Sequence, residues 1–308
     1  MRADGGSRCA SQSGGDFVLK IFLTGSDGFT GRHFTASAIA RGHEVIALTG
    51  QLDDKAGLEH QLAQAQADAV VHLAAIAFVG HADAGAFYDV NVLGTMNLLD
   101  ALARVPKRPA AVLLAARRYS SANIYGNCDV SPIGESQSPA PANHYAMSKL
   151  AMEYMARNYL DRLPIVFARP FNYTGAGQHA SFVIPKLVDH FARRASVVEL
   201  GNLDVEREFN DVRTVCDAYL ALLDKGAPGQ CYNVCSGQPV TLRVVIALLQ
   251  EITGHSLEVR VNPAFVRASE VRTLCGSPAL LEQAIGPLHH PGLRATLQWM
   301  LDTSPVAH

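Results

Sequence analysis

Two residues, Tyr145 and Lys149, have side chains and a spacing that suit proton transfer. They lie four positions apart in a stretch whose apolar residues recur at helical intervals, so both face one side of the predicted helix. A free tyrosine titrates at a pKa of about 10 and needs tuning to work near neutrality. The ammonium of Lys149 would stabilise the phenolate and lower that pKa. The pair predicts an acid-base site, and the alternative is an ordinary solvated helix.

A serine upstream could complete this pair. Ser121 precedes Tyr145 by 24 residues and follows the apolar run at residues 111–115. At the carboxyl end of a strand, its hydroxyl could hydrogen-bond a substrate carbonyl while Tyr145 delivers the proton. The alternative is a serine-rich turn.

Three glycines predict a phosphate-binding turn. Gly25, Gly28 and Gly31 follow the apolar run at residues 18–24 and open an amphipathic stretch at residues 32–41. Gly25 would allow a tight turn, Gly28 a close approach to a pyrophosphate, and Gly31 close packing of helix on sheet. The helix start would offer unpaired amides and a positive dipole end to the phosphates. A plain strand-to-helix turn could also contain three glycines.

The end of the second predicted strand indicates which dinucleotide binds. Residues 45–48 are followed by Thr49 and Gly50, without the carboxylate that would hold an NAD ribose. Such a pocket tolerates a 2′-phosphate, and Arg32 is a candidate counter-charge, although it could equally be a solvated helix residue. We therefore expect NADP(H), with NAD(H) as the alternative.

Taken together, these motifs resemble the extended short-chain dehydrogenase/reductase family over about residues 18–286. The matching segments are residues 25–31, 72–75, 91–95, 121–126, Tyr145 with Lys149, and 169–172. The resemblance implies that Ser121, Tyr145 and Lys149 form the catalytic triad and that Asn91 braces the site. It also implies the cofactor-binding set Gly25, Asp27, Gly28, Phe29, Gly31, Arg32, Thr49, Leu73, Ala74, Ala75, Asn91, Tyr145 and Lys149. A homodimer is expected by the same analogy.

The second half of the chain narrows the resemblance. Residues 169–178, 201–209, 232–237 and 262–271 are similar to GDP-6-deoxy-D-mannose reductases and to the related GDP-mannose 4,6-dehydratases. The resemblance implies a GDP-linked 4-keto-6-deoxy sugar as the partner, bound by Asn123, Asn172, Val183, Arg207, Arg267 and Glu270. Guanidinium groups suit this role because they grip phosphate oxygens through two parallel bonds. Surface salt bridges are the alternative for the two arginines.

Asn123 separates reduction from dehydration. The dehydratases carry a glutamate two residues beyond the catalytic hydroxyl, and an amide at that position cannot act as a base. We therefore expect NAD(P)H-dependent reduction of the C4 ketone of GDP-4-keto-6-deoxy-D-mannose, in deoxysugar or polysaccharide biosynthesis. The product would be GDP-D-rhamnose or its C4 epimer GDP-6-deoxy-D-talose. One alternative is an epimerase or 4,6-dehydratase of the same family. The other is a non-catalytic nucleotide-binding regulator, which is suggested by Arg117 and Arg118 in an apparent insertion at residues 115–119.

The elements that must position these residues alternate along the first half of the chain. Apolar runs at residues 18–24, 45–48, 69–75, 111–115 and 165–168 alternate with helical stretches at 32–41, 58–67, 91–104 and 144–160. This alternation predicts an α/β fold of the Rossmann type, a doubly wound parallel sheet. Beyond Pro170 we expect helices near residues 185–195, 215–223 and 241–252, the last capped by Thr241, and a strand at 231–234.

The expected organisation has three parts. Residues 1–17 read as a flexible tail, residues 18–170 with 210–238 as the NAD(P)-binding Rossmann domain, and residues 171–209 with 239–308 as a smaller C-terminal substrate-binding lobe. The segment after the second strand looks shortened relative to the family.

Composition excludes several classes of protein. The net charge of −2, from 26 basic and 28 acidic residues, gives no field that would recruit nucleic acid or an anionic membrane. No apolar run reaches the roughly 18 residues of a membrane span. We expect a cytoplasmic protein with free thiols, because its six cysteines are scattered. We expect no metal site, since Cys231 and Cys235 lie too far apart on a strand to clamp an ion.

Overall fold

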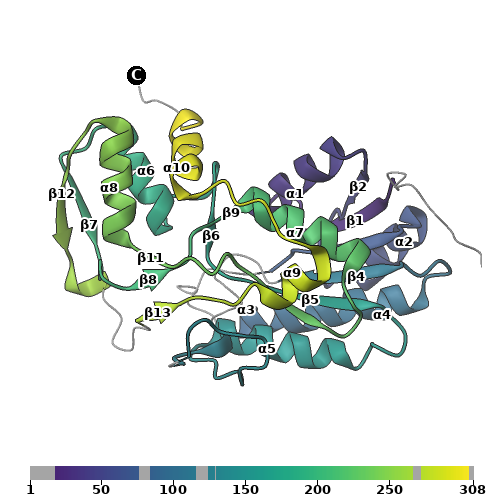
Figure 1. Ribbon diagram of the computed structural model, residues 1–308. Coiled ribbons are helices and arrows are strands. Elements are labelled where there is room, and N and C mark those ends of the chain that lie inside the picture. The colour runs from purple at the N-terminus through teal and green to yellow at the C-terminus, as the bar shows by residue number, and fades with distance from the viewer. Residues whose placement is uncertain (1–17, 76–83, 116–123, 129, 266–271, 305–308) are drawn as a thin grey trace, which may run out of the picture.

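A six-stranded parallel sheet forms the centre of the molecule (Figure 1). The computed structural model describes residues 18–75, 84–115, 124–128, 130–265 and 272–304. The strands are β1 (Lys20–Thr24), β2 (Glu44–Ala47), β3 (Ala69–His72), β4 (Ala111–Ala115), β5 (Ile165–Pro170) and β10 (Cys231–Val234). Their order across the sheet is β2-β1-β3-β4-β5-β10. The predicted doubly wound α/β fold is confirmed.

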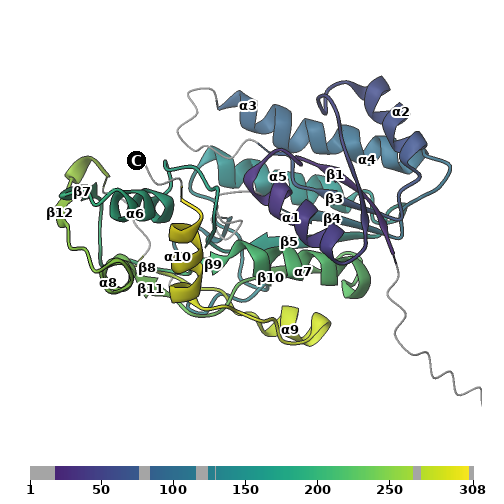
Figure 2. The same cartoon turned by 90° about the horizontal axis from the view of Figure 1, so that it is seen from above.

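Helices cover both faces of this sheet (Figure 2). One layer contains α1 (Phe29–Ala40) and α7 (Val212–Lys225), and the other contains α2 (Lys55–Ala65), α4 (Thr95–Arg104) and α5 (His144–Arg157). Side chains alternate between the two layers along each strand. In β1, Ile21 and Leu23 pack in the core with α1 and α7, whereas Phe22 packs in the core with α2 and α4. Burial on both faces explains why these strands read as continuous apolar runs.

The carboxyl ends of β1 and β3 mark the place where the winding reverses. The chain passes from β1 outward to β2, and α2 then carries it back to β3 on the other side of β1. Residues 48–54 connect β2 to α2. Ligands of open α/β sheets bind in the crevice at such a reversal. The glycine-rich turn lies at this point.

The segment predicted as one helix over residues 91–104 is divided in the structure. A short helix α3 (Gly85–Tyr88) leads into a π-helix at Asp89–Gly94, and α4 begins only at Thr95. Sequence periodicity cannot separate the two, because one π turn changes the spacing of the apolar side chains very little. Such π turns are frequent at functional sites.

Helix starts follow local capping chemistry. Asn143 accepts a hydrogen bond from the amide of Ala146 and so begins α5. Thr241 accepts from the amide of Val244 at the start of α8 (Leu242–Thr253), so its predicted role as a cap is confirmed. The β4 strand and the β10 strand have the predicted bounds.

A second core lies beside the sheet and contains the smaller elements of the second half (Figure 1). It includes α6 (Val183–Ala192), α8, α10 (Leu293–Asp302) and the strand pair β7 (Val197–Leu200) with β12 (Glu258–Val261). Three short strands, β8 (Glu206–Arg207), β11 (Val240–Thr241) and β13 (Thr273–Leu274), form a separate sheet, and β6 (Tyr173–Thr174) pairs with β9 (Asn210–Asp211). A 3₁₀ turn spans Pro263–Phe265.

Helix α9 (Ala279–Ile285) falls in the segment assigned by sequence to the substrate lobe, yet it packs against α7 and β10 of the large sheet. The expected tail at residues 1–17 lies outside the described residues. In the described part of the chain, every helix is too short or too polar to cross a membrane.

Candidate active site

The glycine-rich turn has the geometry that a dinucleotide site requires. Gly25 has φ +73°, and a Cβ there would lie 2.7 Å from the amide nitrogen of Ala74. A Cβ on Gly31 would overlap the carbonyl oxygen of Gly25. Helix α1 starts directly after Gly28 with no acidic residue in its first turn and, among the described residues, no side-chain cap. Its first amides therefore suit a phosphate.

Arg32 and Thr49 flank this turn. Arg32 donates to the carbonyl oxygens of Asp27 at 2.6 Å and of Gly177 at 3.3 Å, so its guanidinium stays beside the turn. Thr49 is held by Gln61, whose Oε1 accepts from the amide and the hydroxyl of Thr49, both at 2.9 Å. The structure thus places both predicted cofactor residues at the same edge of the sheet.

The residues after β3 lie against the turn. Predicted as strand, residues 73–75 have left the ladder, which ends at His72. The amide of Leu73 donates to the carbonyl oxygen of Thr24 at 3.1 Å, and the amide of Ala74 donates to the Thr24 hydroxyl at 3.1 Å. Leu73 and Ala74 are therefore next to Gly25, as the cofactor assignment expects.

His72, the last residue of β3, is buried between two threonine hydroxyls. Its Nδ1 lies 2.7 Å from Thr24 Oγ1, and its Nε2 lies 2.8 Å from Thr95 Oγ1. Burial lowers the pKa of His72 to about 3, and the positive charge of Lys149 adds to that effect. The imidazole is therefore neutral near pH 7 and carries a single ring proton.

The neighbouring bonds decide which nitrogen of His72 holds the proton. The Thr95 hydroxyl donates to the carbonyl oxygen of Asn91 at 2.7 Å, so it accepts from Nε2–H of His72. Nδ1 must then accept from the Thr24 hydroxyl, which itself accepts from the Ala74 amide. A one-way chain of hydrogen bonds consequently runs from Ala74 beside the turn to Asn91 in the π-helix.

Asn91 extends this connection to the helix that carries the tyrosine. Its Nδ2 donates to Ser148 Oγ at 3.0 Å, and the Ser148 hydroxyl donates to the carbonyl oxygen of Tyr145 at 2.8 Å. Asn91 and Ser148 are completely buried. The predicted bracing position of Asn91 thus links the turn to α5.

Tyr145 and Lys149 both point into the protein from α5. Each side chain is 1% exposed, so the pair does not lie on a solvated helix face. The Tyr145 ring packs edge-on against Phe87 at 6.1 Å between centroids, and Lys149 Nζ lies 3.9 Å from Met152 Sδ. A buried ammonium one turn from a buried phenol is the arrangement that proton transfer by tyrosine requires.

The predicted substrate residues are spread over the second half. Asn172 follows β5, and its carbonyl oxygen accepts from the amide and the Nδ2 of Asn210. Val183 is the first residue of α6 and packs against the core of the smaller elements. Arg207 on β8 donates to the carbonyl oxygens of Glu206 at 2.7 Å and Arg272 at 3.4 Å.

Other predicted residues lie outside the described part of the chain. They are Ser121 of the triad, the substrate residues Asn123, Arg267 and Glu270, and the pair Arg117 and Arg118. Their assignments stay predictions. In the described part of the chain, no group of three or more His, Cys, Asp or Glu side chains could hold a metal ion.

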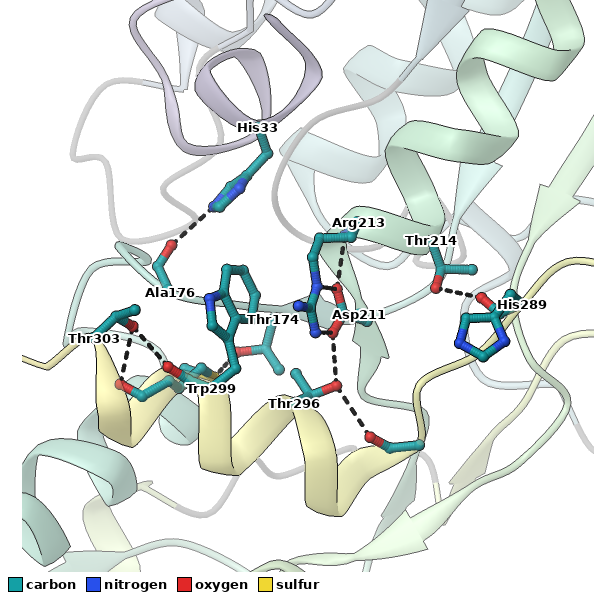
Figure 3. A network of polar contacts seen from close by, with 12 residues as sticks. His33, Thr174, Ala176, Asp211, Arg213, Thr214, His289, Thr296, Trp299 and Thr303 are labelled. Atoms are coloured by element: carbon teal, nitrogen blue, oxygen red, sulfur yellow. Dashed lines mark hydrogen bonds and ion pairs between the residues drawn. The ribbon is translucent and has the colours of Figure 1, made fainter. Parts of the chain in front are cut away.

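Helix α1 is tied to the loop after β5. The Thr30 and Tyr173 hydroxyls are 2.8 Å apart, and His33 Nε2 donates to the carbonyl oxygen of Ala176 at 2.9 Å. Figure 3 shows the second of these bonds beside Trp299 of α10. The rings of His33 and Trp299 pack edge to face, with their centroids 5.6 Å apart.

A charged cluster holds the other side of Trp299 (Figure 3). The Arg213 guanidinium lies 3.9 Å from the centroid of the indole ring and pairs with Asp211 at 2.7 Å. Asp211 also accepts from the Thr296 hydroxyl at 2.8 Å. Helix α10 is therefore fixed against both α1 and the start of α7, which connects the smaller core to the cofactor turn.

Sequence reasoning missed the three hydroxyls of this site. Thr24 stands directly before Gly25, Thr95 four residues after Asn91, and Ser148 directly before Lys149. Their proximity to predicted residues was the only available signal. Their partners, up to 57 positions away, become apparent only in the folded chain.

Comparison with known proteins places the chain in a family. The model of the NAD dependent epimerase/dehydratase family matches residues 21–235. A GDP-6-deoxy-D-talose 4-dehydrogenase from Aggregatibacter actinomycetemcomitans is 34% identical over 288 residues, 92% of this chain and 97% of that protein. A GDP-6-deoxy-D-mannose reductase from Pseudomonas aeruginosa is 37% identical over 287 residues, 87% of this chain and 91% of that protein.

Solved structures agree with this placement. A Burkholderia cenocepacia protein superposes with a TM-score of 0.87 and 45% identity, covering 94% of this chain and 98% of that one. The RMD protein of Pseudomonas aeruginosa, complexed with NADPH, superposes with a TM-score of 0.85 and 34% identity, covering 93% and 98%. The chain belongs to the NAD dependent epimerase/dehydratase family, whose members are NAD(P)-dependent, and this confirms the resemblance to extended short-chain dehydrogenases/reductases.

Proposed function

We propose that this protein reduces the C4 ketone of GDP-4-keto-6-deoxy-D-mannose with a reduced nicotinamide cofactor. The observation that carries the proposal is the burial of Tyr145 and Lys149 together on α5, joined through Asn91 to the glycine-rich turn. Two relatives over 30% identical are named for GDP-6-deoxyhexose oxidoreduction, which supports the choice of substrate.

The residues divide the chemistry among them. The Tyr145 hydroxyl gives its proton to the C4 oxygen, and the Lys149 ammonium stabilises the resulting phenolate. The Ser121 hydroxyl polarises the same oxygen by hydrogen bonding. A bound NAD(P)H supplies the hydride to C4. Asn123 takes the place of the dehydratase glutamate, so elimination of water at C6 has no base at that position.

The substrate is held through its nucleotide and its sugar. Arg207 and Arg267 bind the diphosphate, Glu270 the ribose or base, and Asn172 the phosphate or the sugar. Asn123 and Val183 complete the substrate-binding set. The product is GDP-D-rhamnose or GDP-6-deoxy-D-talose, depending on which face of the ring meets the hydride.

NADPH is the favoured cofactor. Arg32 lies beside the turn, and its described hydrogen bonds go to two carbonyl oxygens, which carry no net charge. The charge of its guanidinium is therefore available to a 2′-phosphate. The NADPH complex of a 34% identical protein supports this preference. Arg32→Ala should raise KM for NADPH about tenfold and leave KM for NADH nearly unchanged, since a charge-assisted contact contributes about 1.5–3 kcal/mol.

The working protein is proposed to be a cytoplasmic homodimer, because its cofactor and substrate are cytoplasmic metabolites and its helices present an apolar face. Leu93 of the π-helix and Met147 and Tyr154 of α5 are 47%, 43% and 60% exposed on elements that pack against each other. Exposed apolar residues on two elements that pack together support a protein interface at this place.

A turnover assay separates the alternatives. The purified protein should consume NADPH with GDP-4-keto-6-deoxy-D-mannose and leave GDP-mannose unchanged, whereas a dehydratase would convert GDP-mannose. Tyr145→Phe should lower kcat by about 10²- to 10⁴-fold and keep NADPH binding. A regulator would show nucleotide binding without turnover, and its biological effect would survive Tyr145→Phe.

A further inference from the structure

A buried guanidinium, that of Arg169, joins the catalytic helix to the central sheet. Arg169 lies near the end of β5 and is 6% exposed. Its Nε donates to the two carboxylate oxygens of Glu153 at 3.1 and 3.2 Å, and a terminal nitrogen donates to Oε2 at 2.6 Å. Glu153, on α5, is 4% exposed. Burial alone would lower the pKa of Arg169, but the hydrogen bonds and charge of Glu153 raise it above its ordinary value.

The other terminal nitrogen of Arg169 reaches Tyr125. It donates to the Tyr125 hydroxyl at 2.8 Å, and that hydroxyl donates to Oδ1 of Asn233 at 2.9 Å. Asn233 on β10 in turn donates from Nδ2 to the carbonyl oxygen of Ile133 at 3.0 Å. Tyr125 and Asn233 are completely buried. One phenol thus completes a chain from α5 through β5 to β10.

The backbone beside Tyr125 is fixed as well. Gly126 has φ +61°, and a Cβ there would overlap the carbonyl oxygen of Ala140. The amide of Ala140 donates to the carbonyl oxygen of Ile124 at 2.7 Å. Ala140 stands three residues before Asn143, the cap of α5. The segment around Tyr125 is therefore attached to the start of the helix through its backbone and to the middle through Arg169.

These attachments surround the proposed catalytic pair. Glu153 follows Lys149 by four residues on the same helix, and Ala140 precedes Tyr145 by five. A buried ion pair is weak evidence for stability, because apolar side chains of similar volume often serve as well. Four hydrogen bonds from the three nitrogens of one planar guanidinium instead restrict position. A misplacement of about 1 Å can cost about 10²-fold in rate.

We infer that Tyr125 is a positioning residue of this enzyme: its hydroxyl, bridging Arg169 and Asn233, sets the placement of α5 and hence of Tyr145 and Lys149. Tyr125 is not a catalytic residue, because it acts through Arg169 and Glu153. The inference rests on the proposed function for its kinetic test, and on the network alone for its second test.

Tyr125→Phe removes one hydroxyl and leaves the ring. The matched control is Tyr159→Phe, two residues beyond the end of α5. The Tyr159 hydroxyl donates to Asp100 at 2.8 Å, the side chain is 7% exposed, and burial raises the pKa of both phenols to about 12. Both variants therefore lose a buried, hydrogen-bonded hydroxyl, so their thermal unfolding midpoints should fall by similar amounts.

The kinetic test compares the two variants with the unmodified protein, using NADPH and GDP-4-keto-6-deoxy-D-mannose. Tyr125→Phe should lower kcat by about tenfold to a hundredfold with KM for both substrates changed less than about twofold. Tyr159→Phe should keep kcat within about twofold. Equal kcat values for the two variants, or a change confined to KM, would overturn the inference. Absence of turnover in the unmodified protein would instead refute the proposed function.

Hydrogen exchange measured by mass spectrometry tests the placement without turnover. Peptides covering residues 145–153 should exchange faster in Tyr125→Phe than in Tyr159→Phe, because only in the first has Arg169, the partner of Glu153 on α5, lost the bond that connects it through Tyr125 to β10. Equal exchange in those peptides would overturn the inference whatever the activity. If Tyr125→Phe does not fold, Asn233→Leu removes the acceptor of the Tyr125 hydroxyl at similar side-chain volume. Its peptides at residues 145–153 should also exchange faster than those of Tyr159→Phe, and equal exchange would overturn the inference.

Discussion

At the scale of single residues, His72 shows how an imidazole is kept neutral near the charged ammonium of Lys149. Its two ring nitrogens are both occupied by threonine hydroxyls, and burial with the nearby Lys149 charge keeps it neutral. A second cation at this position would repel the nearby ammonium of Lys149. Neutrality of His72 therefore spares the Lys149 ammonium that repulsion.

This arrangement predicts a pH-dependent stability. The pKa of His72 is about 3 when folded against 6.5 for the free group, so the unfolded chain binds the extra proton between these values and folding weakens as pH falls through that window. His72→Gln removes the titration. The gap in unfolding free energy between the unmodified protein and His72→Gln should narrow by about 1.4 kcal/mol between about pH 7.5 and about pH 5.5.

Urea unfolding at the two pH values measures this gap. His60→Gln, at an exposed position of α2, is the control and should give a gap that does not depend on pH. A constant gap for His72→Gln would mean that His72 is not held neutral.

At the scale of elements, the sequence predicts the helices and strands that depend on neighbouring residues, but not the strand pairings between distant segments. The runs 111–115 and 231–234 became strands with those bounds because each is a continuous buried stretch. The glycine turn was readable because its three glycines act within seven residues. Strands β8, β11 and β13 have two residues each, too few for any period, and pair across long separations.

The chemistry divides in the same way. Tyr145 and Lys149 could be paired from sequence because a single helix brings them together. The bonds of His72 to Thr24 and Thr95 span 48 and 23 positions, and that of Arg169 to Tyr125 spans 44, so only the fold reveals them.

The glycine turn gives a prediction at this scale. Gly31→Ala should weaken NADPH binding at least about tenfold, because its Cβ would overlap Gly25 O and lie 2.6 Å from Ser26 O, which forces the backbone of the turn to move. Gly134→Ala is the matched control, since a Cβ there meets nothing within 4 Å. Calorimetric titration with NADPH compares the two folded variants; equal affinities would show that the turn does not carry the phosphates.

At the scale of the whole molecule, the site lies where the large sheet meets the smaller core. Trp299 of α10 packs between His33 of the cofactor helix and Arg213 at the start of α7, so the C-terminal helix connects the two halves (Figure 3). The face formed by α5 and the π-helix lies on the other layer of the sheet, away from α1 and α7 (Figure 2). A second copy on that face would leave α10 uncovered.

The proposed dimer gives the prediction at this scale. Tyr154→Arg places a charge on the exposed side of α5 and should convert a dimer into a monomer, because burying an unpaired charge is costly. Light scattering coupled to size-exclusion chromatography measures the molar mass of each variant in solution. Val244→Arg on α8, 44% exposed, should stay dimeric. Dimers for both variants would rule out this face as the interface.

The central claim is that hydride passes from the nicotinamide to C4 of the sugar. Reaction of GDP-4-keto-6-deoxy-D-mannose with NADPH deuterated at the transferring position tests it directly, with the product examined by proton NMR. We expect loss of the C4 proton signal in a GDP-6-deoxyhexose, with one deuterium gained per cofactor oxidised. Cofactor oxidation without deuterium at C4, or an unchanged ketone in the presence of bound NADPH, would contradict it.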